Sequence, residues 1–506
     1  MLFLLALSPI LWLIIALGFL KMSSQKACPL ALVIGLLVAL FIHDMPMMNA
    51  ATAVLEGVAL ACWPILLVII AAIFTYNLSL HTKSMDVIKQ MLTSVSHDRR
   101  VIVLLIGWGF GAFLEGMAGF GTAVAIPASM LVALGFNPVM AATVCLIANT
   151  VPTTFGSIGI PVTTLGQITG ISPMLLAEYA SIQLIPINLI CPFLMVIITG
   201  KSLKALKGMV LITLLAGLGL VIPEIAIAFF VGPELAVMGS SIIIMGLIVI
   251  AAKLTNVDHP DYRMESKSDH VEFKKGLIAC LPFILIFVFL LITSKLIPAI
   301  NQPLNLIKTS VMIYSGEGAS PYTFTWIATP GIMIFLAAFI GGKVQSASLG
   351  DMVRVLKRTV WSLRNSMITI ITVIATAKVM GYSGMTFVIA ETAVEVTGTM
   401  YPFIAPLIGS TGTFITGSGT SSSVLFGNVQ IGAAASISAN KAWLVASNAV
   451  GSAAGKMISP QTIAIAVAAI GATGKDNEIL KTMIMYYIPF VFIMGCVVYF
   501  GQFFLG

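Results

Sequence analysis

Apolar runs that are almost free of charge recur from one end of this chain to the other. They include Leu2 to Leu20, Ala59 to Tyr76, Val210 to Phe230, Phe283 to Ile292 and Tyr487 to Leu505. Most of them approach the roughly 20 residues that a helix needs to cross a bilayer. Only 9% of the 506 residues are charged, against about 25% in a soluble domain. The sequence therefore predicts an all-α polytopic membrane protein, with about 12 to 14 membrane segments.

The remaining composition excludes several classes of function. The net charge of +7 comes largely from loops such as Lys83 to Arg100 and Lys201 to Lys207. Basic loops are typical of the cytoplasmic side, so we expect no nucleic-acid partner. The six cysteines lack CxxC spacing, which argues against a metal site or a disulfide framework. No phosphate-binding GxxxxGK[ST], HExxH or hydrolase motif is present. We expect a carrier driven by gradients, with no enzymatic activity and no cofactor.

Two glycine-rich stretches interrupt the apolar sequence in the same way. The first reads FLEGMAGFGTAV from Phe113, and the second reads TFITGSGTSSSV from Thr413. An asparagine follows the threonine of each Gly-x-Gly-Thr, 27 residues on in the first case and 28 in the second. The matched positions are Gly119 with Gly417, Gly121 with Gly419, Thr122 with Thr420, and Asn149 with Asn448.

The segments upstream of the two stretches differ in charge. The segment from Met85 has a net positive charge, whereas all the charged residues in the segment from Met385 are acidic. Equivalent elements on opposite membrane sides are typical of inverted repeats, whose broken helices meet near the bilayer midplane. We therefore predict four regions: N-terminal helices (1–56), a first repeat (57–200), connecting helices and loops (201–359) and a second repeat (360–506). The alternative is that small residues recur there only to allow close helix packing.

Broken helices at membrane depth predict a protein-lined cavity, because unpaired backbone groups are not tolerated against lipid. A helix that starts at a break directs N–H groups and its positive dipole end at the cavity, which favours a carboxylate. Hydroxyl and amide side chains near the breaks can bind the rest of a solute, although any one of them could instead cap a helix. The candidate binding residues are Gly119, Thr122, Asn149, Thr420, Ser421, Ser422, Asn448 and Lys456.

Three ionisable residues stand out within apolar sequence, where burial of a charge costs at least about 2.5 kcal/mol. Glu115 directly precedes the first break. Burial favours the neutral form of a carboxyl group, so Glu115 is the candidate proton carrier. Lys456 follows Asn448 and is either a counter-charge for the substrate or a partner for Glu115, with snorkelling to an interface as the alternative. Lys378 either snorkels or neutralises an internal acid.

At these residues the sequence resembles the lactate permease family, bacterial proton symporters of L-lactate, D-lactate and glycolate. The similarity runs from about Leu30 to the C-terminus. The stretches that carry it are GAFLEGMAGFGTAVAI, GFNPVMAATVCLIANTVPTTFGSIGIPV, GPEL, SGTSSSVLFGNVQ and GKMISPQTIAIA. The sequence departs from the family in its second motif, where GSGTSSS replaces GSDTSSN and Gly419 stands in place of an acid.

The resemblance implies a multi-pass carrier in the bacterial inner membrane that moves a small 2-hydroxy monocarboxylate together with protons through the lipid bilayer. Lactate is the first expectation and glycolate the second. The resemblance also implies that the matched positions form the site, with Glu115 coupling the proton. A sodium-coupled carboxylate carrier is the closest alternative, because asparagine, serine, threonine and backbone carbonyls at breaks also suit Na⁺. A channel would lack paired breaks.

Overall fold

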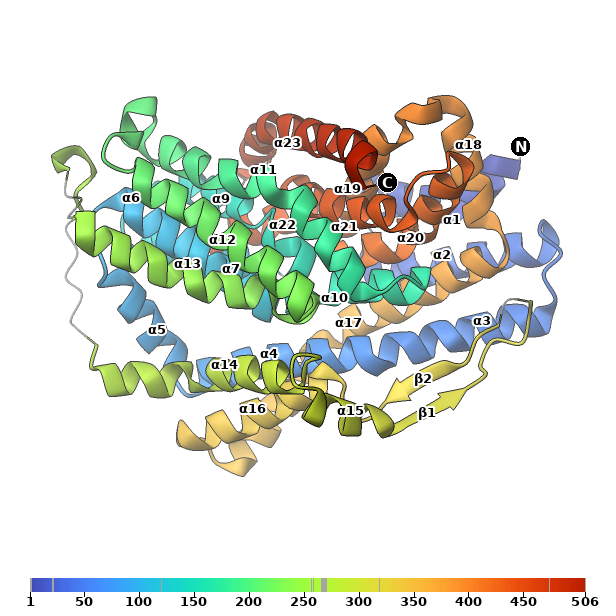
Figure 1. Cartoon of the computed structure of the whole chain (residues 1–506), viewed down its shortest axis with the longest axis horizontal. Helices are drawn as coiled ribbons and strands as arrows, with labels where there is room; N and C mark the ends of the chain where they lie inside the picture. The colour runs from blue at the N-terminus through green and yellow to red at the C-terminus, as the bar shows by residue number, and fades with distance from the viewer. Residues whose placement is uncertain are drawn as a thin grey trace.

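The computed structural model describes residues 2–505 with the exception of 21, 120, 256, 258, 265–270, 318 and 473. Nearly all described segments are helical (Figure 1). The helices up to Gly200 are α1 (Leu2–Leu13), α2 (Ser24–Phe41), α3 (Met47–Leu60), α4 (Leu67–His81), α5 (Ser84–Thr93), α6 (Arg99–Ile102), α7 (Gly111–Met117), α8 (Thr122–Ala133), α9 (Pro138–Ala148), α10 (Gly156–Thr169) and α11 (Pro173–Gly200).

The later helices are α12 (Val210–Phe230), α13 (Pro233–Thr255), α14 (Phe273–Thr293), α15 (Pro298–Leu306), α16 (Pro330–Val344), α17 (Leu349–Tyr382), α18 (Met385–Thr397), α19 (Tyr401–Thr416), α20 (Gly419–Ser436), α21 (Lys441–Ile458), α22 (Pro460–Ala469) and α23 (Asp476–Leu505). Short 3₁₀ or π segments join several of them, among them η2 (Ala61–Leu66), η3 (Val103–Phe110) and η4 (Pro152–Phe155). The strands β1 (Lys308–Val311) and β2 (Tyr322–Thr325) form an antiparallel hairpin.

Within the described residues, nine helical stretches are long and apolar enough to cross a membrane, or ten if the bent pair α9–α10 counts as one span. This confirms a polytopic, essentially all-α protein. Four apolar stretches are shorter, namely Leu2–Leu17, Thr122–Ala133, Pro330–Val344 and Pro460–Ala469. The nine or ten spans found among the described residues are thus fewer than the 12 to 14 membrane segments predicted, and these four stretches are shorter than a full span.

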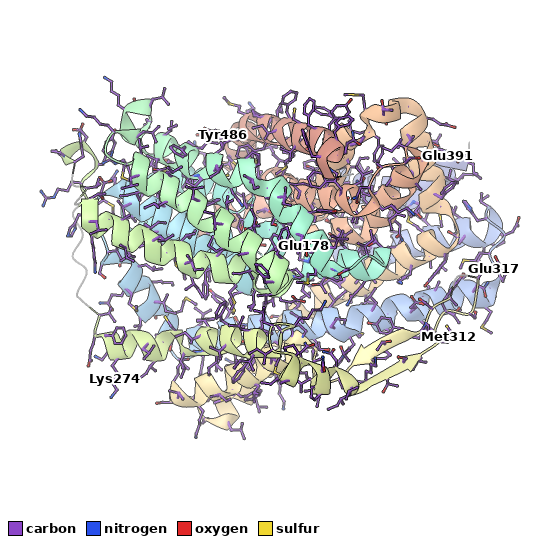
Figure 2. The ribbon with its side chains drawn as sticks, viewed as in Figure 1. Glu178, Lys274, Met312, Glu317, Glu391 and Tyr486 are labelled. Carbon is purple, nitrogen blue, oxygen red and sulfur yellow. The ribbon has the colours of Figure 1, made fainter. Side chains whose placement is uncertain are left out.

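The long helices run along the longest axis of the molecule, and their loops gather at its two ends (Figure 1). Helix α5, which begins the net basic segment from Met85, and the start of α14, marked by Lys274, lie at one end (Figures 1 and 2). The β1–β2 hairpin, Glu317 and the N-terminus lie at the other (Figures 1 and 2). The acidic segment α18, marked by Glu391, also lies at the hairpin end. The segments from Met85 and Met385 are thus at opposite ends, as inverted repeats require.

Elements of the two halves follow in the same order. In each half, one helix (α7 or α19) ends at a glycine-rich break and a second helix (α8 or α20) follows it. A third helix (α9 or α21) begins at an asparagine cap and ends at a second interruption. Asn137 and Asn440 are these caps, and each side chain accepts a backbone N–H at the start of its helix, which satisfies a donor that the helix cannot pair itself. Across the halves, α10 packs on α20 and α8 packs on α22. The inverted symmetry itself stays a prediction.

Candidate functional site

The first glycine-rich stretch forms a sharp break between α7 and α8. Gly119 and Gly121 have φ values of +58° and +84°, which residues with a Cβ rarely adopt. A Cβ on Gly119 would also collide with Ser157 Oγ, and one on Gly121 would meet Ile465 of α22 at 2.7 Å. Both glycines are therefore needed for the turn and for its packing. The Thr122 hydroxyl donates to Gly119 O at 2.8 Å and closes the new helix start.

The second stretch breaks the chain between α19 and α20. Gly417 ends α19 in the left-handed region, with φ of +70°. Ser418 then caps α20, because its Oγ accepts the N–H of Ser421 at 3.2 Å. Thr420 follows in the first turn and is half-buried. The sequence match between the two stretches therefore corresponds to two helix breaks, each followed at once by a helix start.

A third interruption separates α9 from α10. Asn149 ends α9, the 3₁₀ segment η4 follows, and the two helical arms are bent by 58°. Ser157, Ile158 and Gly159 have φ values between +46° and +72°. A Cβ on Gly156 would lie 2.6 Å from Glu115 Oε1. The lack of a side chain at Gly156 thus gives the Glu115 carboxylate its place beside the bend.

A buried ion pair joins the two halves at these interruptions. Lys456 Nζ, near the end of α21, lies 2.5 Å from Glu115 Oε1 of α7. The lysine side chain is 7% exposed and the glutamate side chain 3%. Of the roles predicted for Lys456, the structure places it as the partner of Glu115. Because both charges are removed from water, each depends strongly on the other.

Asn149 completes the polar cluster. When its amide is oriented so that donors face acceptors, Nδ2 donates to Glu115 Oε2 at 2.9 Å and Oδ1 accepts from Lys456 Nζ at 3.3 Å. The three side chains come from α7, α9 and α21, so the cluster exists only when both halves are assembled. Glu115 carries hydrogen bonds on both oxygens, while the Lys456 ammonium has three donors and touches a cavity.

That cavity has a volume of about 600 Å³ and receives residues from both breaks. Gly121 comes from the first break, Gly417 and Ser421 come from the second, and Lys456 lies between them. Ser24 of α2 and Ser366 of α17 add polar groups to the wall. We call this space the Lys456 cavity. The two Gly-x-Gly-Thr stretches, far apart in sequence, therefore meet at one cavity.

Two of the candidate residues lie in the packed interior beside the cavity. Ser422 Oγ donates to Gly409 O of α19 at 2.5 Å. Asn448 Nδ2 donates to Ser422 O at 3.3 Å, and Asn448 Oδ1 accepts from Gln430 Nε2 at 3.5 Å. These bonds tie α19, α20 and α21 together. Ser422 and Asn448 are fully buried and thus hold in place the helix that carries Lys456.

A second buried ion pair was only half anticipated from the sequence. Lys378 Nζ of α17 lies 2.7 Å from Glu56 Oε1 of α3, and the Tyr382 hydroxyl donates to the same oxygen at 2.9 Å. The prediction that Lys378 either snorkels or neutralises an internal acid is confirmed in its second form. Glu56 was not singled out, although it is the one charge in the apolar stretch ATAVLEGVALACW, which is the signal that could have identified it.

A buried acid that pairs with no cation among the described residues lies elsewhere, between α11 and α12. Glu224 Oε1 accepts from Asn188 Nδ2 at 3.4 Å, and both side chains are at most 1% exposed. Glu224 lies inside the run Val210 to Phe230, which was predicted only as a membrane helix. Its position away from both breaks explains why the repeat argument did not find it.

Comparison with known proteins identifies the family. A family model described as L-lactate permease matches residues 2–505, which extends the similarity to the first helix. An L-lactate permease of Streptococcus iniae is 46% identical over 87% of this chain and 93% of its own length. The Escherichia coli glycolate permease is 33% identical over 98% of this chain and 94% of its own, and the Bacillus subtilis L-lactate permease is 32% identical over 98% and 95%. With the paired breaks, the buried Glu115–Lys456 pair and a family match over almost the whole chain, this multi-pass membrane protein belongs to the L-lactate permease family of transporters.

Proposed function

We propose that this protein imports L-lactate by proton symport across the bacterial cytoplasmic membrane, with D-lactate and glycolate as further substrates. Its similarity to proteins named L-lactate permease and glycolate permease supports this substrate class. Both acids carry a carboxylate with a hydroxyl on the adjacent carbon. The Lys456 cavity, about 600 Å³ in volume, is large enough for such a molecule together with water.

The observation that carries the proposal is the Glu115–Lys456 pair at the wall of this cavity. A substrate carboxylate that binds Lys456 competes with Glu115 for the same ammonium group. Glu115, deprived of its cation in a buried position, then binds a proton, because a buried carboxylate without a partner is strongly disfavoured. Substrate and proton therefore promote each other's binding, as reciprocal coupling requires.

Other groups at the breaks suit the rest of the substrate. The start of α20 lies at the cavity, because Ser418 and Ser421 line its wall, and the positive end of a helix dipole favours an anion. The Ser421 hydroxyl on the wall can bind the 2-hydroxyl group, and Thr420 is its neighbour in the first turn. The loops at the α5 end of the molecule are basic, which favours the cytoplasmic side for that end and the outer side for the hairpin end.

The test is uptake of labelled L-lactate, D-lactate, glycolate and a dicarboxylate into proteoliposomes, with pH and Na⁺ gradients imposed separately. Accumulation of lactate under an inward proton gradient alone supports the proposal. Accumulation that needs Na⁺ instead identifies a sodium-coupled carboxylate carrier. Uptake that neither saturates nor follows a gradient identifies a channel.

A further inference from the structure

The Glu56–Lys378 pair separates two cavities that the function described above does not use. A cavity of about 280 Å³, the hairpin cavity, is lined by Glu56, Trp63, Gln167, Tyr322 and Lys378. The α20 cavity, of about 320 Å³, is lined by Lys378, Tyr382, Asn428 and Gly432. Lys378 belongs to both walls. A charged group that lines two cavities is in reach of any solute that enters either of them.

The hairpin cavity is lined on one side by β2 and the residues just before it, from Ser320 to Thr325. Trp63 Nε1 donates to Thr325 O of β2 at 3.0 Å, and the Tyr322 hydroxyl donates to Trp63 O. These bonds fix the hairpin over η2, where the α3–α4 helix is kinked. The β1–β2 hairpin, which lies outside the membrane helices, therefore forms one fixed wall of the cavity.

Two buried oxygen atoms at this pair have no hydrogen-bond partner among the described residues. Glu56 uses Oε1 for both Lys378 and Tyr382, and among the described residues nothing pairs with its buried Oε2. Gln167 Oε1, on the wall of the hairpin cavity, is likewise buried with no partner in the described part of the chain. Unpaired buried polar atoms are costly. Their presence on a cavity wall beside an ammonium group fits a ligand that is both an anion and a hydrogen-bond donor.

We propose that Lys378 is a second carboxylate site, at which the substrate's carboxylate takes over Lys378 from Glu56 and its 2-hydroxyl donates to Gln167 Oε1. This inference rests on the proposed transport of 2-hydroxy monocarboxylates and adds a separate substrate-binding site on the outer side. A carboxylate bound to the ammonium supplies the charge-assisted hydrogen bonds that Glu56 supplies in its absence, while Glu56 keeps the Tyr382 hydroxyl on Oε1 and takes the co-transported proton on its unpaired Oε2. The 2-hydroxyl distinguishes lactate from an unsubstituted acid of the same length.

The proposed binding sites at Lys456 and Lys378 lie along the same helices. On α17, Ile370 lines the Lys456 cavity, and Lys378 follows eight positions later, about 12 Å along the axis at 1.5 Å per residue. On α20, Ser421 lines the Lys456 cavity and Asn428 lines the α20 cavity, about 10 Å further along. The walls of the Lys456 cavity and of the cavities at Lys378 therefore approach each other to about 10 to 12 Å along α17 and α20.

A purely structural role is the alternative, because a buried ion pair can simply hold α3 against α17. Variants that keep the side-chain size separate the two roles: Glu56→Gln, Lys378→Gln and the double variant. The matched control is Arg354→Gln, which removes an exposed ion pair with Asp351 on the same helix α17. Lactate KM is measured in proteoliposomes under a proton gradient, and thermal unfolding of the purified protein is followed in detergent.

We expect Lys378→Gln to raise the KM for L-lactate about tenfold, the value of one charge-assisted hydrogen bond. Glu56→Gln, which removes the internal competitor, keeps or lowers the KM. The double variant recovers the unfolding temperature but keeps the raised KM, and Arg354→Gln behaves as wild type. A double variant that regains the wild-type KM overturns the second site, as does an unchanged KM in Lys378→Gln.

Gln167→Leu provides an independent check on the hydroxyl contact. Its KM for lactate rises while inhibition of uptake by propionate, which lacks the hydroxyl, is unchanged. Equal effects on both acids overturn the assigned contact. Wild-type protein that takes up no lactate refutes the proposed function as a whole, whereas wild-type uptake with unaltered KM in all these variants refutes only the second site.

Discussion

Lys456 donates to Glu115 across 341 positions of sequence, in a contact of 2.5 Å that both residues make inside the protein. In the proposed cycle this contact breaks each time substrate binds. A glutamine at position 115 mimics the protonated carrier permanently. We expect Glu115→Gln to abolish accumulation of lactate driven by a pH gradient while retaining exchange of internal for external lactate.

Both activities are measured in the same vesicles, with the amount of inserted protein determined separately. Exchange without accumulation is the expected pattern. Continued accumulation by Glu115→Gln, when only a proton gradient is present, would remove Glu115 from the coupling step and direct attention to the substrate's own carboxyl group.

Removal of Lys456 leaves the Glu115 carboxylate without its cation. Lys456→Gln strands the Glu115 carboxylate in a buried position, and breaking a buried pair in this way costs about 3 to 5 kcal/mol. We expect a lower unfolding temperature and no uptake. The double variant Glu115→Gln with Lys456→Gln has no stranded charge, so it should regain most of the unfolding temperature and still fail to transport. Recovery of uptake in the double variant would contradict a substrate role for Lys456.

Asn448 supports the helix that carries this lysine. Asn448→Leu removes the donor to Ser422 O and the acceptor for Gln430, and each buried polar atom left unpaired costs about 1 to 3 kcal/mol. We expect uptake to be lost while the protein still inserts. Size-exclusion chromatography after solubilisation checks insertion and folding, and uptake at normal affinity would show that these bonds are not needed to hold Lys456 in place.

Gly455, the residue before Lys456, sets the distance between α21 and α19. A Cβ at this position would overlap the carbonyl group of Ser410, and overpacking of this kind costs about 1 to 3 kcal/mol. We expect Gly455→Ala to lower the unfolding temperature. Gly246→Ala in α13 is the matched control, because nothing lies within 4 Å of a Cβ there; it should be neutral or stabilising, since alanine favours a helix over glycine. Equal behaviour of the two variants would contradict this packing.

Local sequence rules predicted the breaks well, because glycines at Gly119 and Gly417 and the charge at Glu115 stand out against an apolar background. The partners in the buried ion pairs were harder to predict. The partner of Glu56 is Lys378, 322 positions away, and no local pattern encodes which helices pack together. The hairpin β1–β2 was also not anticipated, since its four-residue strands are too short to give a clear alternating pattern. Buried helices such as α20 are covered by protein, so their polar residues obscure the hydropathy that identifies membrane spans.

The cavities beside Lys456 and Lys378 have an electrical consequence. If water fills these cavities, the membrane potential falls mainly across the protein between them. Ile370 and Lys378, one on each wall, are about 12 Å apart along α17, against the roughly 30 Å of a bilayer's hydrocarbon. An unaccompanied lactate anion that crosses this layer does electrical work of about 2.3 kcal/mol per 100 mV. An anion that crosses together with one proton carries no net charge, and the potential then neither drives nor opposes its movement.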